Sequence, residues 1–360
     1  MKLPSLKIGE LVAEIPIVQG AMGVGVSLSK LASAVANEGG IGVISGVQIG
    51  FDEADFEHNN DMANIRALKK HIRKARELSP KGILGVNLMV AINNYKEMVM
   101  AAVEEKIDII ISGAGLPKDL PSLVEGSKTK IAPIVSSAKA AALISKLWDR
   151  KFRYIPDLVI VEGVEAGGHL GFSDEELNSA KTPALGTIVK EVIEALKPYA
   201  EKYNKSIPVI AAGGIFDGSD IAKYIKLGAA GVQIGTRFVA TEECDADIEF
   251  KKAYINSKKE DIGLVKSPVG MAGRAIHNSF IKNLEKGKTP IKKCYNCLKP
   301  CNPKTAPYCI SKALINSVKG NVEEGLIFAG SNAYRIKDIV SVKELISDLV
   351  SESQMILQEG

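Results

Sequence analysis

The stretch L-V-I-V-E-G-V-E-A-G-G-H-L-G, from Leu158 to Gly171, joins a short apolar run to a glycine pair and a histidine. Leu158–Glu162 is apolar at nearly every position, which is typical of a parallel strand buried on both faces. Gly167 and Gly168 carry no Cβ, so the backbone there can approach a flat ligand closely. His169 can exchange a proton near neutral pH, although a histidine satisfied within the core is the alternative. The stretch therefore predicts a buried strand that ends in a ligand-binding loop.

Seven further runs share this apolar, β-branched pattern, and helical patterns separate them. Strand and helix alternate eight times through residues 1–239, which predicts a closed (β/α)8 TIM barrel of the α/β class. An open doubly wound sheet is the alternative, because sequence periodicity does not show whether a sheet closes. The expected strands are Ile15–Gln19, Gly42–Ser45, Leu84–Met89, Asp108–Ser112, Ala132–Ser136, Leu158–Glu162, Pro208–Ala212 and Gly231–Gly235.

The pattern changes after Val239. Residues 240–319 are polar, rich in lysine and contain four clustered cysteines, so we expect a smaller, mostly helical cap subdomain there. Residues 320–360 turn apolar at helical spacing again, and we expect this segment to pack back on the barrel. Within the barrel, Ser27 precedes an apolar-periodic segment and is predicted to be the N-cap of its helix.

The composition narrows the class of protein. The 360 residues carry a formal net charge of +4, and no basic tract interleaves with aromatic residues, which argues against a nucleic-acid partner. No apolar run reaches the roughly 18–20 residues of a membrane span, and the first residues lack the apolar core of a signal peptide. We therefore expect a cytoplasmic protein with a small-molecule substrate; a homodimer is one assembly left open.

Glycine-rich loops follow several of the predicted strands, at the end of a βα barrel where active sites form. Gly213 and Gly214 follow the seventh strand, and Gly235 and Thr236 end the eighth. Barrels commonly bind phosphate at these two loops through free backbone N–H groups, and a threonine adds a hydroxyl donor. The alternative is that these glycines serve tight turns only.

A phosphate site beside a flat-ligand pocket suits flavin mononucleotide (FMN). Asn87, inside the third strand, could hydrogen-bond the edge of the flavin ring, with a structural hydrogen bond as the alternative. The backbone around Gly20, Ala21 and Met22 could flank the ring, with core packing as the alternative for the methionine.

Five ordered motifs resemble those of the nitronate monooxygenase (2-nitropropane dioxygenase-like) family, whose superfamily includes the FMN-dependent enoyl-[acyl-carrier-protein] reductases. The motifs are P-I-V-Q-G-A-M, G-V-N-L-M, E-G-V-E-A-G-G-H-L-G, I-A-A-G-G-I-F-D-G and V-Q-I-G-T-R-F, between about Ile15 and Val239. The resemblance implies a barrel with non-covalent FMN and a catalytic His169. The residues it implies for the flavin are Asn87, Glu162, Gly167, Gly214, Gln233, Ile234, Gly235 and Thr236. From the glycine pattern, Gly168 and Gly213 are expected at the same site.

The resemblance leaves two reactions open. As a monooxygenase, the protein would oxidise alkyl nitronates with O2, and His169 would act as the base. As a reductase, it would use NAD(P)H to reduce an enoyl thioester, and Glu162, where nitronate monooxygenases often have glutamine, favours this branch. A non-catalytic flavin- or phosphate-binding protein is a third hypothesis from a different class; it would predict loss of the histidine or the glycine loops, and both are present.

Cys294, Cys297, Cys301 and Cys309 follow the spacing C-x2-C-x3-C-x7-C, with prolines between them. Four thiolates in sixteen residues can close around one metal centre. The spacing fits a 4Fe-4S cluster, and it resembles the iron–sulfur segment of dienoyl-CoA-reductase-like flavoenzymes except in the last gap. A structural zinc ion and unligated or disulfide-bonded cysteines are the alternatives.

Overall fold

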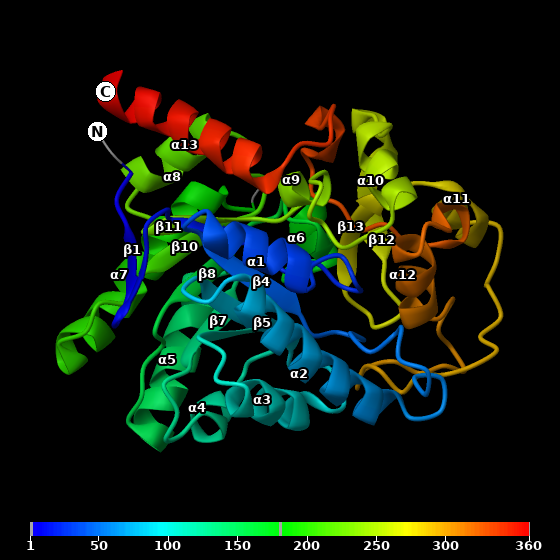
Figure 1. Ribbon diagram of the computed structural model, residues 1–360, viewed down its shortest axis with the longest axis horizontal. Helices are drawn as coiled ribbons and strands as arrows, with labels where there is room; N and C mark the ends of the chain where they lie inside the picture. Colours follow the sequence, from blue (N-terminus) through cyan, green and yellow to red (C-terminus); the bar gives the residue numbers. More distant parts are fainter. Residues whose placement is uncertain (1–2, 180–181, 360) are drawn as a thin grey trace.

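Eight parallel strands close into a barrel in the computed structural model, which describes residues 3–179 and 182–359 (Figure 1). The ring follows chain order, and the pairing of Val232 with Ile17 closes it. The closed barrel is thus confirmed, and each predicted run overlaps one of its strands. The strands are β3 (Ile17–Gln19), β4 (Ile41–Ser45), β5 (Ile83–Met89), β6 (Ile109–Gly113), β7 (Lys130–Val135), β8 (Val159–Glu162), β10 (Val209–Ala212) and β11 (Gly231–Ile234).

Side chains from alternate strand positions fill the barrel interior, because successive residues of a strand point to opposite faces. Val43, Ile111, Ile160 and Ile210 belong to this interior cluster. A hairpin of β1 (Leu6–Ile8) and β2 (Leu11–Ala13) contributes Leu6, Ile8 and Ala13 to the same cluster. The interior is therefore a packed core, and a ligand has room only at the rim of the barrel.

Helices cover the outside of the barrel, where each packs its apolar stripe on the outward-facing strand residues. The helix α5 begins where Ser137 Oγ accepts a hydrogen bond from Ala140 N–H, as an N-cap serine does. The helices of the barrel are α1 (Ser29–Asn37), α2 (Asn60–Leu78), α3 (Tyr95–Glu104), α4 (Leu120–Leu123), α5 (Ala138–Phe152), α6 (Asp174–Asn178), α7 (Leu185–Tyr203), α8 (Gly218–Lys226) and α9 (Thr236–Val239).

The prediction that Ser27 caps the first helix is wrong. The helix α1 begins at Ser29, and no side chain of its N-cap residue makes a capping hydrogen bond. Ser27 is fully buried, and its Oγ accepts hydrogen bonds from Gln19 Nε2 and Met22 N–H, both at 3.0 Å. The serine therefore stabilises the loop after β3 through hydrogen bonds with Gln19 and Met22, and it does not cap a helix.

A residue far along the chain caps α1 instead. The half-buried carboxylate of Asp245 accepts hydrogen bonds from the backbone N–H groups of Leu28, Lys30 and Leu31, at 2.8, 3.3 and 3.2 Å. These N–H groups have no partner within the helix, and a carboxylate also complements the positive end of the helix dipole. One side chain of the C-terminal part thus secures the first helix of the barrel.

The C-terminal part contains the helices expected there and a hairpin that the sequence pattern did not predict. The strands β12 (Ile262–Lys266) and β13 (Ala272–Ile276) pair antiparallel, and β13 pairs with β9 (Gly168–His169) from the loop after β8. The helices are α10 (Ile248–Ile255), α11 (Ser279–Leu284), α12 (Ile310–Val318) and α13 (Val342–Glu359), with 3-10 turns at Lys259–Asp261, Val322–Glu324 and Ala333–Arg335.

The last helix returns to the barrel. In Figure 1, α13 (red) lies along α8, and Gly218 N–H, at the start of α8, donates a 2.7 Å hydrogen bond to Glu352 on α13. The residues between α9 and α13 lie to one side of the barrel, around α10 and α12. None of the described helices combines the length and apolar character needed to cross a membrane.

Replacement of Asp245 by alanine should destabilise the protein by about 1–2 kcal/mol, because three N–H groups of α1 lose their acceptor. Thermal unfolding followed by circular dichroism measures the effect. The matched control is Asp338→Ala, which removes an exposed carboxylate from the same half of the chain. Equal melting temperatures for the two variants would contradict a capping role for Asp245.

Candidate active site

A cavity of about 270 Å³ lies at the carboxyl ends of the barrel strands. Loops after β3, β4, β6, β8, β10 and β11 and the end of β5 line it, together with residues between 250 and 330. The predicted site residues that line it are Gly20, Ala21, Met22, Asn87, Glu162, Gly167, Gly168, His169, Gly213, Gly214, Gln233, Gly235 and Thr236. The barrel thus brings together residues that are more than 200 positions apart in the sequence.

Ile234 is the predicted flavin residue that does not reach the cavity. Its side chain is buried in the apolar layer outside the barrel strands, next to Ile17 and Phe238. Its carbonyl oxygen accepts a 2.8 Å hydrogen bond from Gly20 N–H. Ile234 therefore supports the loop that carries Gly20, and only its neighbours Gln233 and Gly235 line the cavity.

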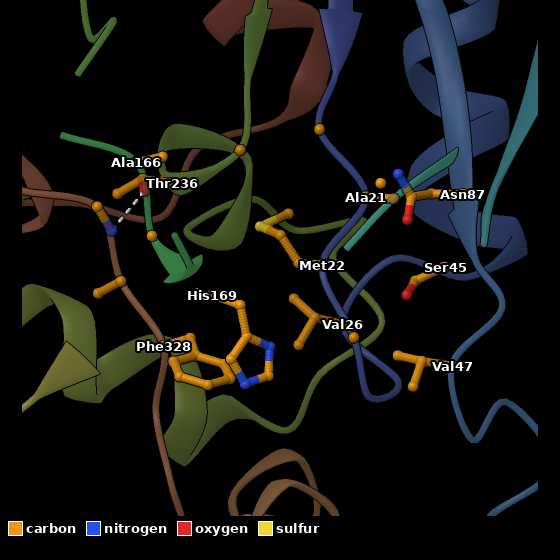
Figure 2. A pocket seen from close by; sticks show the side chains of 18 of the residues that line it. Ala21, Met22, Val26, Ser45, Val47, Asn87, Ala166, His169, Thr236 and Phe328 are labelled. Atoms are coloured by element: carbon orange, nitrogen blue, oxygen red, sulfur yellow. Dashed lines mark hydrogen bonds between the residues drawn. The ribbon is translucent and has the colours of Figure 1, made fainter. Parts of the chain in front are cut away.

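His169 belongs to β9, which the hairpin strand β13 holds by pairing Gly273 with His169. Its Nε2 lies 2.7 Å from Oγ of Ser267, and the Phe328 ring stands edge-on with its centroid 5.1 Å from the imidazole centroid. Figure 2 shows the imidazole between Phe328 and Val26, with Met22 above it. Burial lowers the pKa of His169 to about 4, so the imidazole is neutral at pH 7 and can accept a proton.

Glu162 and Asn87 reach the cavity from the carboxyl ends of β8 and β5. Neither side chain makes a hydrogen bond to any other residue in the described part of the chain. Burial raises the pKa of Glu162 to about 7, because no cation compensates the cost of desolvating its charge. These groups have polar atoms available for a ligand that enters the cavity.

Two loop glycines are required by close backbone packing. Gly213 has φ +98°, a conformation that favours glycine, and a Cβ there would lie 3.0 Å from the carbonyl oxygen of Gly163. A Cβ on Gly167 would lie 2.5 Å from the backbone nitrogen of Gly330. Backbone packing therefore requires both glycines, in addition to the ligand contact inferred from the glycine pattern.

Thr236 connects the two sides of the cavity. Gly330 N–H donates a 3.1 Å hydrogen bond to Thr236 Oγ1, drawn as the dashed line in Figure 2. The hydroxyl proton of Thr236 remains available, so the side chain can still donate to an anion. The loop around Gly330 is thus part of the predicted phosphate site.

An acidic side chain also lies at this site. Glu165 lines the cavity, and a Cβ on Gly214 would collide with its Oε2. The Glu165 charge opposes the lowering of the Arg274 pKa by burial, so the two side chains interact. The Arg274 guanidinium donates a 2.9 Å hydrogen bond to the Val164 carbonyl. A bound phosphate would therefore have a carboxylate close by.

Several cavity residues were not predicted from the sequence. All of them lie outside the barrel motifs, either on the hairpin, on the cap or in the loop after β4. No local sequence pattern identifies them. Phe328 contacts His169, as does Ser267, which does not itself line the cavity. The others include Val47, Gln48, Tyr254, Leu298, Ile310, Leu314 and Leu326.

The four clustered cysteines lie beside the cavity, and Cys297 lines it. Cys294 is exposed and the other three are half-buried, all with free thiols. Burial raises the pKa of Cys301 and Cys309, and the neighbouring charges of Cys294 and Cys297 raise both further. Within residues 3–179 and 182–359, however, no group of three or more His, Cys, Asp or Glu side chains is arranged to hold a metal ion, so the predicted ligand set is not assembled.

A closed (β/α)8 barrel with glycine loops, a neutral histidine and unpaired polar groups around one rim cavity defines a barrel enzyme of the flavin-binding type. The sequence profile described as "Nitronate monooxygenase" matches residues 5–352, so the chain belongs to the nitronate monooxygenase family. It is therefore an FMN-dependent oxidoreductase, and the hypothesis of a non-catalytic binding protein is wrong.

Relatives and solved structures agree with this assignment. A "Probable nitronate monooxygenase" of Staphylococcus aureus (strain JH9) is 29% identical over 297 residues, covering 75% of this chain and 78% of the relative. The structure of FabK from Thermotoga maritima has a TM-score of 0.74 and 26% identity, covering 96% of this chain and 94% of that chain. A nitroalkane oxidase from Streptomyces ansochromogenes shares the fold, with a TM-score of 0.71, 20% identity and coverage of 96% and 97%.

The raised pKa of Glu162 predicts how stability depends on pH. Between pH 4.5 and 7 the folded, cofactor-free protein binds a proton that the unfolded chain has lost, so stability falls as pH rises through this window. We expect the free energy of unfolding of Glu162→Gln, relative to that of the wild type, to rise by on the order of 3 kcal/mol between pH 4.5 and pH 7. Urea unfolding at both pH values measures this.

The control for this substitution is Glu201→Gln, which changes an exposed glutamate. Its difference from the wild type should not vary with pH. If Glu162→Gln behaved like this control, Glu162 would be ionised in the folded protein.

Proposed function

We propose that this FMN-dependent oxidoreductase oxidises small nitroalkanes and their nitronates with O2, and that His169 is the catalytic base. The observation that supports this proposal is the neutral imidazole in the cavity, because a general base has to be unprotonated before the reaction. Its pKa of about 4 makes it a weak base before substrate binds, and the charge of a nitronate formed beside the imidazolium would raise that pKa.

The residues of the cavity fit a flavin. In this proposal Asn87 and Glu162 hydrogen-bond the ring, and the loop Gly20–Met22 lies against it. The phosphate binds at the loops after β10 and β11, where Gly214 and Thr236 lie. When bound, FMN supplies the electron-transfer chemistry that no side chain provides.

The charge of the cavity bears on the form of the substrate. No lysine or arginine is among the described residues that line it, so the cavity favours a neutral nitroalkane over an anion. In the proposed reaction, Nε2–H of His169 donates to Ser267 Oγ, and Nδ1 takes the proton from the substrate carbon. The imidazolium that forms then pairs with the nitronate. Ser267 is a positioning residue, because it orients the imidazole without contacting substrate.

An NAD(P)H-dependent FMN enoyl-thioester reductase is the second candidate. The likeness to FabK over nearly the whole chain favours it. The final protonation in that reaction needs a proton donor, and the low pKa of His169 makes the imidazole poorly suited to this role. We therefore place the reductase second.

Two assays of the flavin-loaded protein separate these reactions. Oxygen uptake with nitroethane or its nitronate, without NAD(P)H, is expected for the monooxygenase. Anaerobic oxidation of NADH or NADPH with a crotonyl thioester, and no oxygen uptake with the nitro compound, would assign the reductase instead. The variant His169→Ala should keep bound FMN and lose nitroethane turnover by about 10²–10⁴-fold.

The matched control is His58→Ala, because His58 is exposed and outside the cavity. It should keep wild-type turnover. Turnover with nitroethane that survives in His169→Ala would remove His169 from the role of base while leaving the oxidoreductase assignment intact.

Glu165 provides a test of the phosphate position. The Glu165 carboxylate lies against Gly214, so Glu165→Gln removes a negative charge beside the proposed phosphate position. We expect FMN to bind more tightly by about 1 kcal/mol, or roughly 5-fold in Kd. Fluorescence titration of the cofactor-free protein measures Kd, with the exposed Glu175→Gln as the control. An unchanged or weaker affinity would place the phosphate away from this loop.

A further inference from the structure

The loop that carries the four cysteines forms one wall of the cavity. Leu298 makes a β-bridge with Ile92, Lys299 N–H donates to the Ala91 carbonyl at 2.8 Å, and Cys297 and Leu298 line the cavity. The bonds attach this loop to the segment after β5. The conformation of the loop therefore determines the shape of the cavity.

Little regular structure supports this wall. The described chain has no helix or strand from the end of α11 to the start of α12 at Ile310. Loops of this length without secondary structure are uncommon in compact domains and usually need a function or another source of order. Disulfides and structural metals are the usual cross-links where a packed core is too small.

The four cysteines lie in the part of this segment where such a cross-link would act. Cys297 and Cys301 pack against one apolar cluster, and Cys297 and Cys309 pack against a second. Cys294, three residues before Cys297, completes the group and is exposed at its edge. The four cysteines thus come from one loop and the start of α12, near enough for the charges of Cys294 and Cys297 to raise the pKa of Cys301 and Cys309.

Hydrogen-bond donors or a helix N-terminus lie at three of these sulfur atoms. Asn296 N–H donates to Cys294 Sγ at 3.4 Å, and Asn296 has φ +47°, so the turn between Cys294 and Cys297 curls back on the first sulfur. Ser311 hydrogen-bonds the Cys297 side chain, and Cys309 is the N-cap of the nine-residue helix α12. N–H donors and a helix N-terminus both favour a thiolate, but burial raises the pKa of Cys297 and Cys309 overall, so these thiols lose their protons when a metal binds.

We propose that Cys294, Cys297, Cys301 and Cys309 together bind one thiophilic metal centre, which fixes the loop 294–309 as a wall of the cavity. The sulfur atoms are not in ligand geometry in the described residues, so binding requires the side chains to turn toward a common centre, with loss of the thiol protons to solvent. Four thiolates suit either a zinc ion or a 4Fe-4S cluster.

Metal analysis of the full chain, purified without oxygen, tests this proposal independently of the reaction. We expect about one zinc per chain, or about four iron and four acid-labile sulfide per chain, and these two results distinguish the two centres. The variants Cys301→Ser and Cys309→Ser should lose most of the metal and expose the loop 294–309 to limited proteolysis.

Cys244→Ala is the matched control, because Cys244 is buried in a separate cluster and should leave the metal content unchanged. Metal content that is equal in Cys301→Ser, Cys309→Ser and the wild type would overturn the proposal. A wild-type chain without stoichiometric metal, both as purified and after incubation with zinc or with iron and sulfide, would also overturn it. Neither readout depends on nitronate or thioester turnover, so failure here leaves the proposed reaction untouched.

Discussion

The closure of the barrel by the pairing of β11 with β3 is the constraint on which the site depends. It places the loop after Gln19 beside the loop after Ile234, and the hydrogen bond from Gly20 N–H to the Ile234 carbonyl joins them. All eight strands then end at one rim, so Asn87 and Glu162 face a common cavity although they come from different strands. An open sheet would leave the same residues along an edge, without an enclosed volume between them.

The barrel was predictable because strands buried on both faces carry a strong local signal. Runs such as Ile109–Ile111 are apolar at every position, and the polar or glycine residues just after them mark the site end of the barrel. The cap of α1 was not predictable in this way. Ser27 has a side chain typical of an N-cap but lies one residue before the N-cap position, and Asp245 makes the bonds instead. No sequence pattern links Leu28 to a residue 217 positions away.

The other side of the cavity illustrates the same limit. Ser267 and Phe328 reach His169 only because β13 pairs with β9, and this antiparallel contact joins the cap to a two-residue strand in a barrel loop. The strand β13 reads A-G-R-A-I, without the alternation that identifies a hairpin. The partners of the histidine thus depend on tertiary pairing, whereas the histidine itself stands in a recognisable motif.

Desolvation shifts the pKa values of the two titratable groups of the cavity in opposite directions. Burial raises the pKa of Glu162 and lowers that of His169, so both groups favour their uncharged forms. A neutral carboxyl group donates a hydrogen bond and a neutral imidazole accepts a proton, so one environment assigns opposite roles to two titratable groups. Because the same barrel can serve oxidases and reductases, this division of roles bears more on the reaction than the fold does. The cap supplies the apolar side chains that exclude water, and it therefore maintains the pKa shifts on which the roles depend.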